Sequence, residues 1–322
     1  ICMHFTEEAL IFDCAGDSLV GVLAVPERVE RTGALIVVGG PQYRVGSHRQ
    51  FVRLARRLAD AGVACLRFDY RGMGDASGAQ RSFASVEADI AAAMQAFATA
   101  LPQVDQIVLW GLCDGASAAC LSLANEPKFA GAVLLNPWVR TEAGHAKTML
   151  RHYYLRRIVD GRFWRKLLRG EFAFGSSLRA LKSTVAGASL ASDSRAESTT
   201  MQLSQVTQAA KPAHLADVPQ LPARMLDALQ RSRRPIAVFL SGRDYVAREF
   251  EQLVRNDRGW RRLLDSAQAS VQRFSGADHT FSRREHAEAV ELATLVWLSK
   301  QGFVAANAAD IAHSAQRAPE RI

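Results

Sequence analysis

The chain has 322 residues and a formal net charge of +8, with 48% hydrophobic and 22% charged residues. This is the composition of an ordinary globular protein, and it excludes a disordered chain. The longest apolar runs, such as ALIVV and FAGAVLL, are far shorter than the ~20 residues that cross a bilayer. An α/β fold of this length often forms one domain with an insertion.

The cysteines are scattered, odd in number and without the spacing of a metal site: Cys2, Cys14, Cys65, Cys113 and Cys120. This pattern predicts reduced thiols rather than a disulfide framework, and therefore a cytoplasmic protein. The first residues, ICMHFTEEAL, lack the basic start and long apolar stretch of a secretory signal. Because the sequence starts with Ile1 rather than Met, this observation says nothing about residues upstream of it.

Strand-like runs alternate with helical patterns, which predicts an α/β fold with a mostly parallel sheet and helices on both faces. ALIFDC and SLVGVLAVP are expected to form a hairpin, followed by the strand ALIVVGG and a helix over residues 47–62. VACLRFD, DQIVLW and GAVLLN are further strands, with helices over residues 82–101 and after WGLCDGAS. The pattern resumes with the strand PIAVFLSG, a helix over 249–267, the strand SVQRF and a last helix over 282–300.

The alternation of strand and helix patterns stops between residues 139 and 234. There, aromatic and basic segments precede the polar stretch STVAGASLASDSRAESTTMQLSQVTQ. We predict that residues 139–234 are an inserted, partly helical cap or lid. The two parts of the α/β core are then residues 1–138 and 235–302, and residues 303–322 are expected to be a frayed tail.

Much of the positive charge lies in RHYYLRRIVDGRFWRKLLRG, residues 151–170. A solvated basic helix face is the favoured interpretation, and peripheral contact with an anionic membrane is the functional alternative. No nucleic-acid motif accompanies the run, so nucleic acid is not expected as a partner. The sequence leaves the oligomeric state open.

The stretch WGLCDGAS places Cys113 between Gly111 and Gly115, after a strand and before a small-residue helix. This arrangement predicts a nucleophile elbow, in which glycines allow a tight turn and close backbone contacts. The helix N-terminus favours a thiolate, but Asp114 adds negative charge, so a histidine partner is required. The alternatives are a buried structural thiol and a serine lost from an inactive enzyme.

The same template predicts an acid and then a histidine further along the chain. Asp244 in VFLSGRDYV follows a strand, and His279 in RFSGADHTF follows the last strand. We predict that His279 accepts the thiol proton while Asp244 orients the imidazole. Asp244 could instead cap a helix or pair with Arg243, and His279 could be a surface loop residue. Asp278 is a weaker candidate for the orienting acid.

The oxyanion hole is expected to use the N–H of Asp114 and a second N–H from the loop GGPQYRVGSHRQ. Pro41 has no N–H, so Gln42 is the expected second donor and Tyr43 the fallback. An exposed basic loop is the favoured interpretation of the charges that follow. The weak candidates for substrate binding there are Tyr43, Arg44 and His48, with Arg49 beside them.

The loop RFDYRGMGDASG, residues 67–78, is expected on the same side of the sheet. Asp69 and Arg71 are predicted to brace the active-site loops through hydrogen bonds. The chain shows neither metal-ligand spacing nor a dinucleotide fingerprint, so we expect no metal and no cofactor.

Several segments together resemble the α/β-hydrolase superfamily: GGPQYRVGSHRQF, LRFDYRGMGDASG, GLCDGAS, LLNPWVRTE, SGRD and GADHTF. More narrowly they resemble the exosortase A system-associated hydrolase 1 family, over roughly residues 8–300. The resemblance implies a cytoplasmic bacterial hydrolase encoded beside exopolysaccharide and protein-sorting machinery, with Cys113, Asp244 and His279 as its triad. The cysteine departs from the broader serine-hydrolase pattern, although a similar cysteine elbow occurs in the dienelactone hydrolases.

We therefore predict an enzyme that hydrolyses an ester or thioester bond of a small substrate through an acyl-cysteine intermediate. Acyl transfer to a polysaccharide or lipid precursor is the main alternative, because a thioester also donates its acyl group to amines and alcohols. A non-catalytic protein with a hydrolase fold that binds a ligand or partner is a third interpretation.

Overall fold

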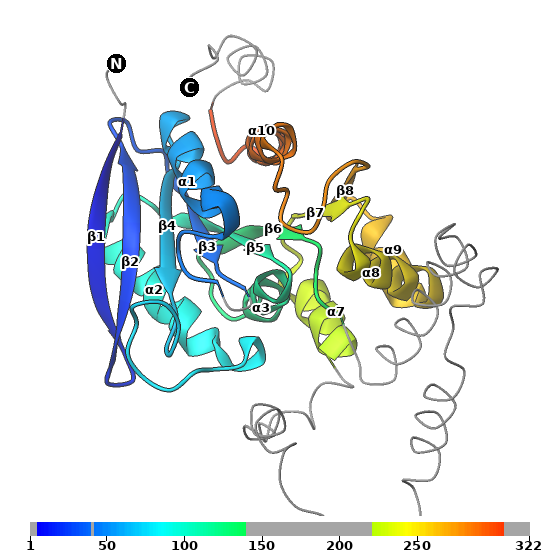
Figure 1. Ribbon diagram of the computed structural model, residues 1–322, viewed down its shortest axis with the longest axis horizontal. Helices are drawn as coiled ribbons and strands as arrows, with labels where there is room; N and C mark the ends of the chain where they lie inside the picture. The colour runs from blue at the N-terminus through cyan, green and yellow to red at the C-terminus, as the bar shows by residue number, and fades with distance from the viewer. Residues whose placement is uncertain (1–4, 40–41, 140–220, 306–322) are drawn as a thin grey trace, which may run out of the picture. The chain divides into compact units, whose positions relative to one another are not determined.

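The computed structural model describes residues 5–39, 42–139 and 221–305. Within these residues an eight-stranded sheet has the order β1-β2-β4-β3-β5-β6-β7-β8 (Figure 1). Its strands are β1 (Phe5–Cys14), β2 (Asp17–Pro26), β3 (Thr32–Val37), β4 (Ala64–Asp69), β5 (Gln106–Leu112), β6 (Phe129–Leu135), β7 (Ile236–Ser241) and β8 (Ala269–Phe274). β2 pairs antiparallel with β1 and β4, and the other pairs are parallel. The mostly parallel α/β sheet that the sequence predicts is confirmed.

Three inner strands of the sheet are buried along their whole length because helices cover both faces of the sheet. Every residue of β3, β4 and β7 is buried. The sequences of β3 and β7 are nearly continuous runs of apolar residues, and β4 also carries Arg67 and Asp69. Such runs, without polar alternation, are typical of parallel strands covered on both sides. β8 lies at the edge of the sheet and is mostly exposed.

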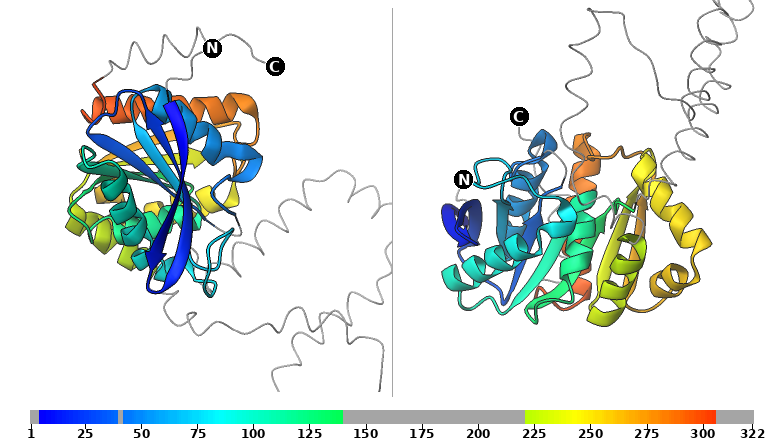
Figure 2. Two further views of the ribbon diagram at one scale, coloured as in Figure 1. Left: turned by 90° about the vertical axis from the view of Figure 1, so that its left-hand side faces the viewer. Right: turned by 90° about the horizontal axis from the view of Figure 1, so that it is seen from below.

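Two helices, α1 (Gln50–Asp60) and α10 (Arg284–Lys300), pack against each other on one face of the sheet, above it in Figure 1. The opposite face carries α2 (Glu87–Ala100), α3 (Asp114–Ser122), α7 (Leu221–Ser232), α8 (Tyr245–Asn256) and α9 (Arg258–Leu264). Figure 2 shows the helices on both sides of the twisted sheet. Phe51, Leu54 and Leu58 form the buried face of α1, as the helical periodicity predicts.

The prediction of one helix over residues 249–267 is wrong in detail. The chain forms two helices there, α8 and α9, and the first begins at Tyr245. Asp244 caps α8, so that helix starts at Tyr245. Asp257 then has extended backbone angles and accepts the N–H groups of Gly259 and Trp260, at 2.7 and 3.0 Å, as the N-cap of α9. Each aspartate therefore opens a helix by binding its first free N–H groups.

Most of the predicted cap, residues 140–220, lies outside the described residues, and so does the basic segment 151–170. Residues 221–232, the last part of the predicted cap, form α7, which packs on α3 and α9. The end of the predicted tail, residues 306–322, is also outside the described part. None of the helices in the described ranges has the length and apolar character to cross a membrane. The cytoplasmic location stays a prediction.

Candidate active site

Cys113 lies at the sharp turn between β5 and α3, with φ 61° and ψ −124°. Non-glycine residues seldom adopt positive φ, and such strained positions cluster at functional sites. The backbone around Cys113 holds this turn in place. Its N–H donates to the Leu135 carbonyl at the end of β6 at 2.9 Å, and its carbonyl accepts the N–H of Trp138 at 3.2 Å and of Ala116 at 3.1 Å. The nucleophile elbow predicted from the glycine spacing therefore has the expected backbone.

Three glycines let the backbone close tightly around this turn. A Cβ on Gly111 would lie 2.5 Å from the carbonyl of Gly115, and a Cβ on Gly115 would lie 2.5 Å from the Val37 carbonyl oxygen. At the end of β3, a Cβ on Gly39 would lie 2.3 Å from Oδ1 of Asp114. These distances exclude a side chain at each position unless the backbone moves.

Cys113 is half-buried, whereas the other described thiols, Cys14, Cys65 and Cys120, are buried. Burial raises the pKa of all three, that of Cys65 to about 12. A buried thiol with a raised pKa is a poor nucleophile, because the thiolate is the reactive form. Within the described residues, Cys113 is therefore the cysteine suited to reaction with a small molecule.

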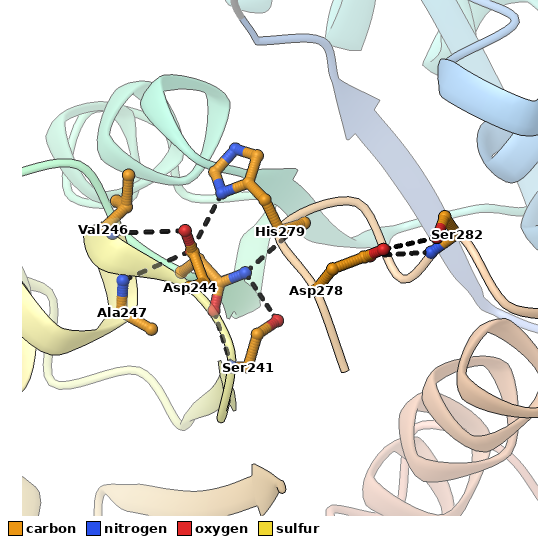
Figure 3. Close-up of polar contacts among 8 residues, drawn as sticks. Ser241, Asp244, Val246, Ala247, Asp278, His279 and Ser282 are labelled. Atoms are coloured by element: carbon orange, nitrogen blue, oxygen red, sulfur yellow. Dashed lines mark hydrogen bonds and ion pairs between the residues drawn. The ribbon is translucent and has the colours of Figure 1, made fainter. Parts of the chain in front are cut away.

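His279 lies in the loop between β8 and α10 and joins Cys113 to Asp244. Its Nδ1 atom is 2.8 Å from Oδ2 of Asp244 (Figure 3). The Cys113 side chain also acts on the ring and raises its pKa. Because Nδ1 faces Asp244, Nε2 is the nitrogen left for the thiol. Hydrogen bonds to Asp244 and then to Cys113 raise the pKa of His279 to about 10, although partial burial opposes the shift. The imidazolium is therefore the expected form of His279 at neutral pH.

Asp244 performs two structural tasks at once. Its carboxylate accepts the N–H groups of Val246 and Ala247, at 3.2 and 3.3 Å, and caps α8 (Figure 3). The same carboxylate binds His279 while the residue is only 6% exposed. Helix capping and orientation of the histidine, which the sequence offered as alternatives, therefore coexist in this residue.

Asp278, the weaker candidate for the orienting acid, points away from the His279 ring toward Ser282 (Figure 3). It accepts the Ser282 N–H at 2.9 Å and also the Ser282 hydroxyl. Burial raises the pKa of Asp278, but the hydrogen bonds from Ser282 outweigh this and lower it overall. The side chain thus stabilises the turn after His279 instead of contacting its ring.

The two predicted oxyanion donors, Asp114 and Gln42, come from the start of α3 and from the loop after β3. Asp114 is the first residue of α3, directly after Cys113, and its Oδ1 accepts the Gly115 N–H at 3.0 Å. The side chain of Gln42 accepts the Ser47 N–H at 3.2 Å, which anchors the loop after β3. Residues 40–41, which connect Gln42 to Gly39, lie outside the described residues. The donor role of Gln42, and the fallback Tyr43, stay predictions.

Arg44 is held by carboxylates rather than turned outward for substrate. Its guanidinium forms ion pairs with Asp69 and, at 2.5 Å, with Asp75, and its N–H donates to Asp69 at 2.6 Å. Tyr43 is 46% exposed, and its ring lies 6.0 Å from the Arg44 guanidinium carbon. His48 has a left-handed backbone in the short turn before α1. Substrate contacts of Tyr43, Arg44 and His48 stay predictions.

The bracing that the sequence predicts for Asp69 and Arg71 agrees with their hydrogen bonds. Asp69 connects the loop after β3 to its own loop through Arg44 and the N–H of Asp75. Arg71 donates from Nε and Nη2 to Asp89 of α2, at 3.0 and 2.8 Å, with both side chains buried. This bidentate pair fixes the loop after β4 to the helix layer.

Two polar residues in this region were missed by the sequence reasoning. Tyr70, after β4, donates its hydroxyl to the Val38 carbonyl at 2.5 Å, next to Gly39. Asn136, after β6, hydrogen-bonds Ser241 and the His279 carbonyl. Both directly follow buried strands, so a polar residue at the carboxyl end of a parallel strand was the available signal.

In the described part of the chain, no group of three or more His, Cys, Asp or Glu side chains could hold a metal ion. The arrangement of Cys113, His279 and Asp244 can instead support nucleophilic catalysis, since the base is hydrogen-bonded to an orienting acid and interacts with the thiol. All three lie at the carboxyl ends of parallel strands, where ligands of open α/β sheets bind.

Comparison with known proteins agrees with this architecture. A protein family described as "Serine aminopeptidase, S33" matches residues 33–310. Among curated protein sequences, none matches the chain. The Pyrococcus furiosus esterase Pf2001 is similar in structure, with a TM-score of 0.59 and 14% identity over 92% of this chain and 94% of that one.

Two further solved structures resemble the chain. Est1E from Butyrivibrio proteoclasticus, bound to ferulic acid, has a TM-score of 0.56 and 18% identity, covering 91% of this chain and 99% of that one. The Pyrococcus horikoshii acylaminoacyl peptidase has a TM-score of 0.56 and 15% identity, covering 92% of this chain and 41% of that one. At these identities the similarities establish the fold.

Proposed function

Because this chain belongs to the α/β-hydrolase family described as serine aminopeptidase, S33, we propose that it hydrolyses ester or thioester bonds with Cys113 as the nucleophile. One observation carries the proposal: His279 hydrogen-bonds the Asp244 carboxylate, and the Cys113 side chain is the second partner that raises its pKa. Esterases among the similar structures support an ester substrate. An imidazolium against Sγ stabilises the thiolate, which is the nucleophilic form of cysteine.

The reaction follows from the positions of these groups. Sγ of Cys113, whose proton has passed to Nε2 of His279, attacks the carbonyl carbon, and the C=O electron pair moves to oxygen. When the C=O re-forms, the bond to the leaving alcohol or thiol breaks, and that group takes the proton from His279. His279 then accepts a proton from water, which attacks the thioester. The bond from the carbonyl carbon to Sγ then breaks, the acid leaves, and Cys113 is again a thiolate beside the protonated His279.

A cysteine nucleophile favours substrates whose alcohol or thiol is a good leaving group. In the first tetrahedral intermediate the Cys113 thiolate and the substrate's leaving group compete for departure, and a thiolate leaves more easily than an alkoxide. Productive breakdown therefore favours good leaving groups, as in aryl esters and thioesters. The N–H of Asp114 and an N–H of the loop after β3 are the proposed donors to the oxyanion.

The proposal is tested by turnover of p-nitrophenyl esters, hydroxycinnamate esters and acyl-CoA thioesters. We expect Cys113→Ala to lower kcat/KM by at least about 10³-fold, since the covalent step is lost. Cys120→Ala, which removes a buried thiol from α3, is the matched control and should keep turnover. Retained turnover in Cys113→Ala would refute the cysteine mechanism.

Acyl transfer is the second candidate, and the thioester intermediate is what favours it. Such an intermediate reacts with amines and alcohols as well as with water, so a polysaccharide or lipid precursor could accept the acyl group. Products are compared with and without an oligosaccharide or fatty-alcohol acceptor. Turnover that requires the acceptor identifies a transferase. The link to exopolysaccharide and exosortase systems, implied by the sequence resemblance, belongs to this proposal.

A ligand-binding protein without catalysis predicts an inert Cys113. Iodoacetamide at neutral pH, followed by peptide mass spectrometry, should label Cys113 and spare the buried Cys14, Cys65 and Cys120. A Cys113 that stays as unlabelled as these buried thiols would favour the binding protein. The proposed membrane contact of residues 151–170 is tested separately by flotation with anionic liposomes.

A further inference from the structure

Asn136 follows the end of β6 and is linked by hydrogen bonds to the segments that carry the three proposed catalytic residues. It directly follows Leu135, whose carbonyl accepts the Cys113 N–H at 2.9 Å. Its side chain binds Ser241, which lies three residues before Asp244, and the backbone carbonyl of His279. Asn136 is completely buried, and Ser241 is 3% exposed.

The orientation of the Asn136 amide is fixed by its partners. Its Oδ1 accepts the Ser241 N–H at 2.8 Å, and its Nδ2 donates to the His279 carbonyl oxygen at 3.2 Å. A backbone N–H can only donate and a carbonyl can only accept, so the reversed amide would face like groups on both sides. Nδ2 also donates to Ser241 Oγ at 2.9 Å, so each polar atom of the buried amide is bonded.

The backbone of Asn136 also limits the residue types that fit this position. Its φ is 44°, in the left-handed region, which asparagine tolerates better than most side chains. Its own N–H donates to the Phe239 carbonyl of β7 at 3.0 Å. Aspartate could adopt the same backbone but would place an oxygen against the His279 carbonyl. Glycine could adopt it but would offer no amide.

We propose that Asn136 is a positioning residue, which holds the His279 backbone at the distance from Cys113 and Asp244 that the reaction requires. His279 is carried by a loop, so the direction of its ring depends on the contacts that fix this loop. Asn136 hydrogen-bonds this loop and β7, and it follows the buried end of β6 directly. The inference rests on the proposed function, in which His279 transfers the proton.

The test compares Asn136→Asp with Ser241→Ala in the full chain. Asn136→Asp keeps the acceptor for the Ser241 N–H but loses the bond to the His279 carbonyl. Ser241→Ala removes a hydroxyl from the same buried cluster and leaves that bond intact. For Asn136→Asp we expect kcat to fall by about 10- to 100-fold with KM within about threefold, since a displacement of about 1 Å can cost this much. Ser241→Ala should stay within about threefold of the wild type in both constants.

A spectroscopic readout separates positioning from stability. The Nδ1–H bond of His279 to Asp244 should give a far-downfield proton resonance by NMR in the wild type and in Ser241→Ala, and Asn136→Asp should lose it. Circular dichroism and the thermal midpoint establish that each variant is folded. If Asn136→Asp does not fold, Asn136→Gly replaces it, because glycine accepts the left-handed backbone and lacks the amide.

These measurements distinguish failure of the positioning role of Asn136 from failure of the proposed function. An Asn136→Asp protein that keeps both the resonance and kcat overturns the inference, and so does a wild type without the resonance. A Ser241→Ala protein that loses as much as Asn136→Asp also overturns it, because the effect is then general to the cluster. If the resonance behaves as expected but the wild type turns over no ester or thioester, the proposed function fails while the positioning role stands.

Discussion

The Nδ1 atom of His279 lies 2.8 Å from Oδ2 of Asp244, a carboxylate that also caps α8. The histidine is therefore oriented by a side chain that is itself fixed at the end of β7 by the helix that follows it. The orienting group gains rigidity from the two N–H groups of Val246 and Ala247. The double role also allows the catalytic and structural contributions of Asp244 to be separated by mutation.

Asp244→Asn should abolish most activity and keep the cap of α8. Asparagine caps helices about as well as aspartate, so α8 keeps its N-cap. It lacks the negative charge that stabilises the His279 imidazolium and selects its tautomer, so kcat should fall by about 10²- to 10⁴-fold. The measurement is kcat by ester hydrolysis beside the thermal midpoint.

Asp244→Ala is the comparison variant, because it removes the cap as well. It should lose the same activity, and its unfolding free energy should be about 1 kcal/mol lower than that of Asp244→Asn, because only Asp244→Ala lacks the cap. Asp257→Ala, which removes the cap of α9 far from the site, should lose similar stability with kcat unchanged. An Asp244→Asn protein with wild-type kcat would remove Asp244 from the mechanism.

Removal of either partner should lower the pKa of His279, and loss of the Asp244 charge should lower it more than loss of the Cys113 thiol. The hydrogen bond to Asp244 is the larger cause of its rise to about 10, and the bond to Cys113 is the next. Cys113→Ser should therefore lower the pKa of His279, and Asp244→Asn should lower it further. Titration of the His279 Cε1–H resonance by NMR measures this. Equal values in all three proteins would contradict the geometry.

The same shift makes stability depend on pH. The pKa of His279 is about 10 in the folded state and about 6.5 in an unfolded chain, so folding favours the protonated form. Its stabilising contribution is complete below about pH 6.5 and is lost as the pH rises through about 10. We expect the thermal midpoint to fall less between pH 7 and pH 10 in His279→Gln than in the wild type. An identical fall in both proteins would exclude this contribution.

Much of this arrangement could be predicted from the sequence because it depends on local patterns. Buried apolar runs located the strands, and the glycines around Cys113 located the elbow, since a turn this tight leaves no room for a Cβ. The chain order of Cys113, Asp244 and His279 follows the order of the strands.

Other features could not be predicted, because they depend on contacts between distant segments. The partner of Arg71 is Asp89, 18 residues away on α2, and nothing in the local pattern identifies it. The role of Asn136 depends on β6 and β7 being neighbours in the sheet, although α7 and residues 140–220 separate them in the chain. The break at Asp257 was missed because the apolar periodicity continues across it.

Gly39→Ala should damage the site as well as the fold. Its Cβ would lie 2.3 Å from Oδ1 of Asp114 and 2.6 Å from the Gly115 N–H nitrogen, so the turn and the loop after β3 must separate. We expect a loss of about 1–3 kcal/mol in unfolding free energy and a fall of about tenfold or more in kcat.

Gly33→Ala, at the other end of β3, is the control for this prediction. Its Cβ would lie 2.5 Å from the ring of Phe97, so it should destabilise the protein and leave the kcat of the folded fraction unchanged. Urea unfolding and ester hydrolysis measure the two quantities. If the two variants lose kcat equally, Gly39 has no particular role at the site.

Removing one partner of the buried pair of Arg71 and Asp89 should be among the most destabilising single changes outside the apolar core. The Asp89 side chain is fully buried and that of Arg71 is 7% exposed, and Asp89 also accepts the Arg71 N–H at 2.9 Å. Asp89→Ala leaves a buried guanidinium without its partner, so we expect a loss of about 3 kcal/mol or more in urea unfolding. Asp227→Ala breaks the exposed pair with Arg231, 60% and 65% exposed, and should change stability by less than about 0.5 kcal/mol. Equal effects of the two substitutions would mean that water solvates Arg71 after Asp89 is removed.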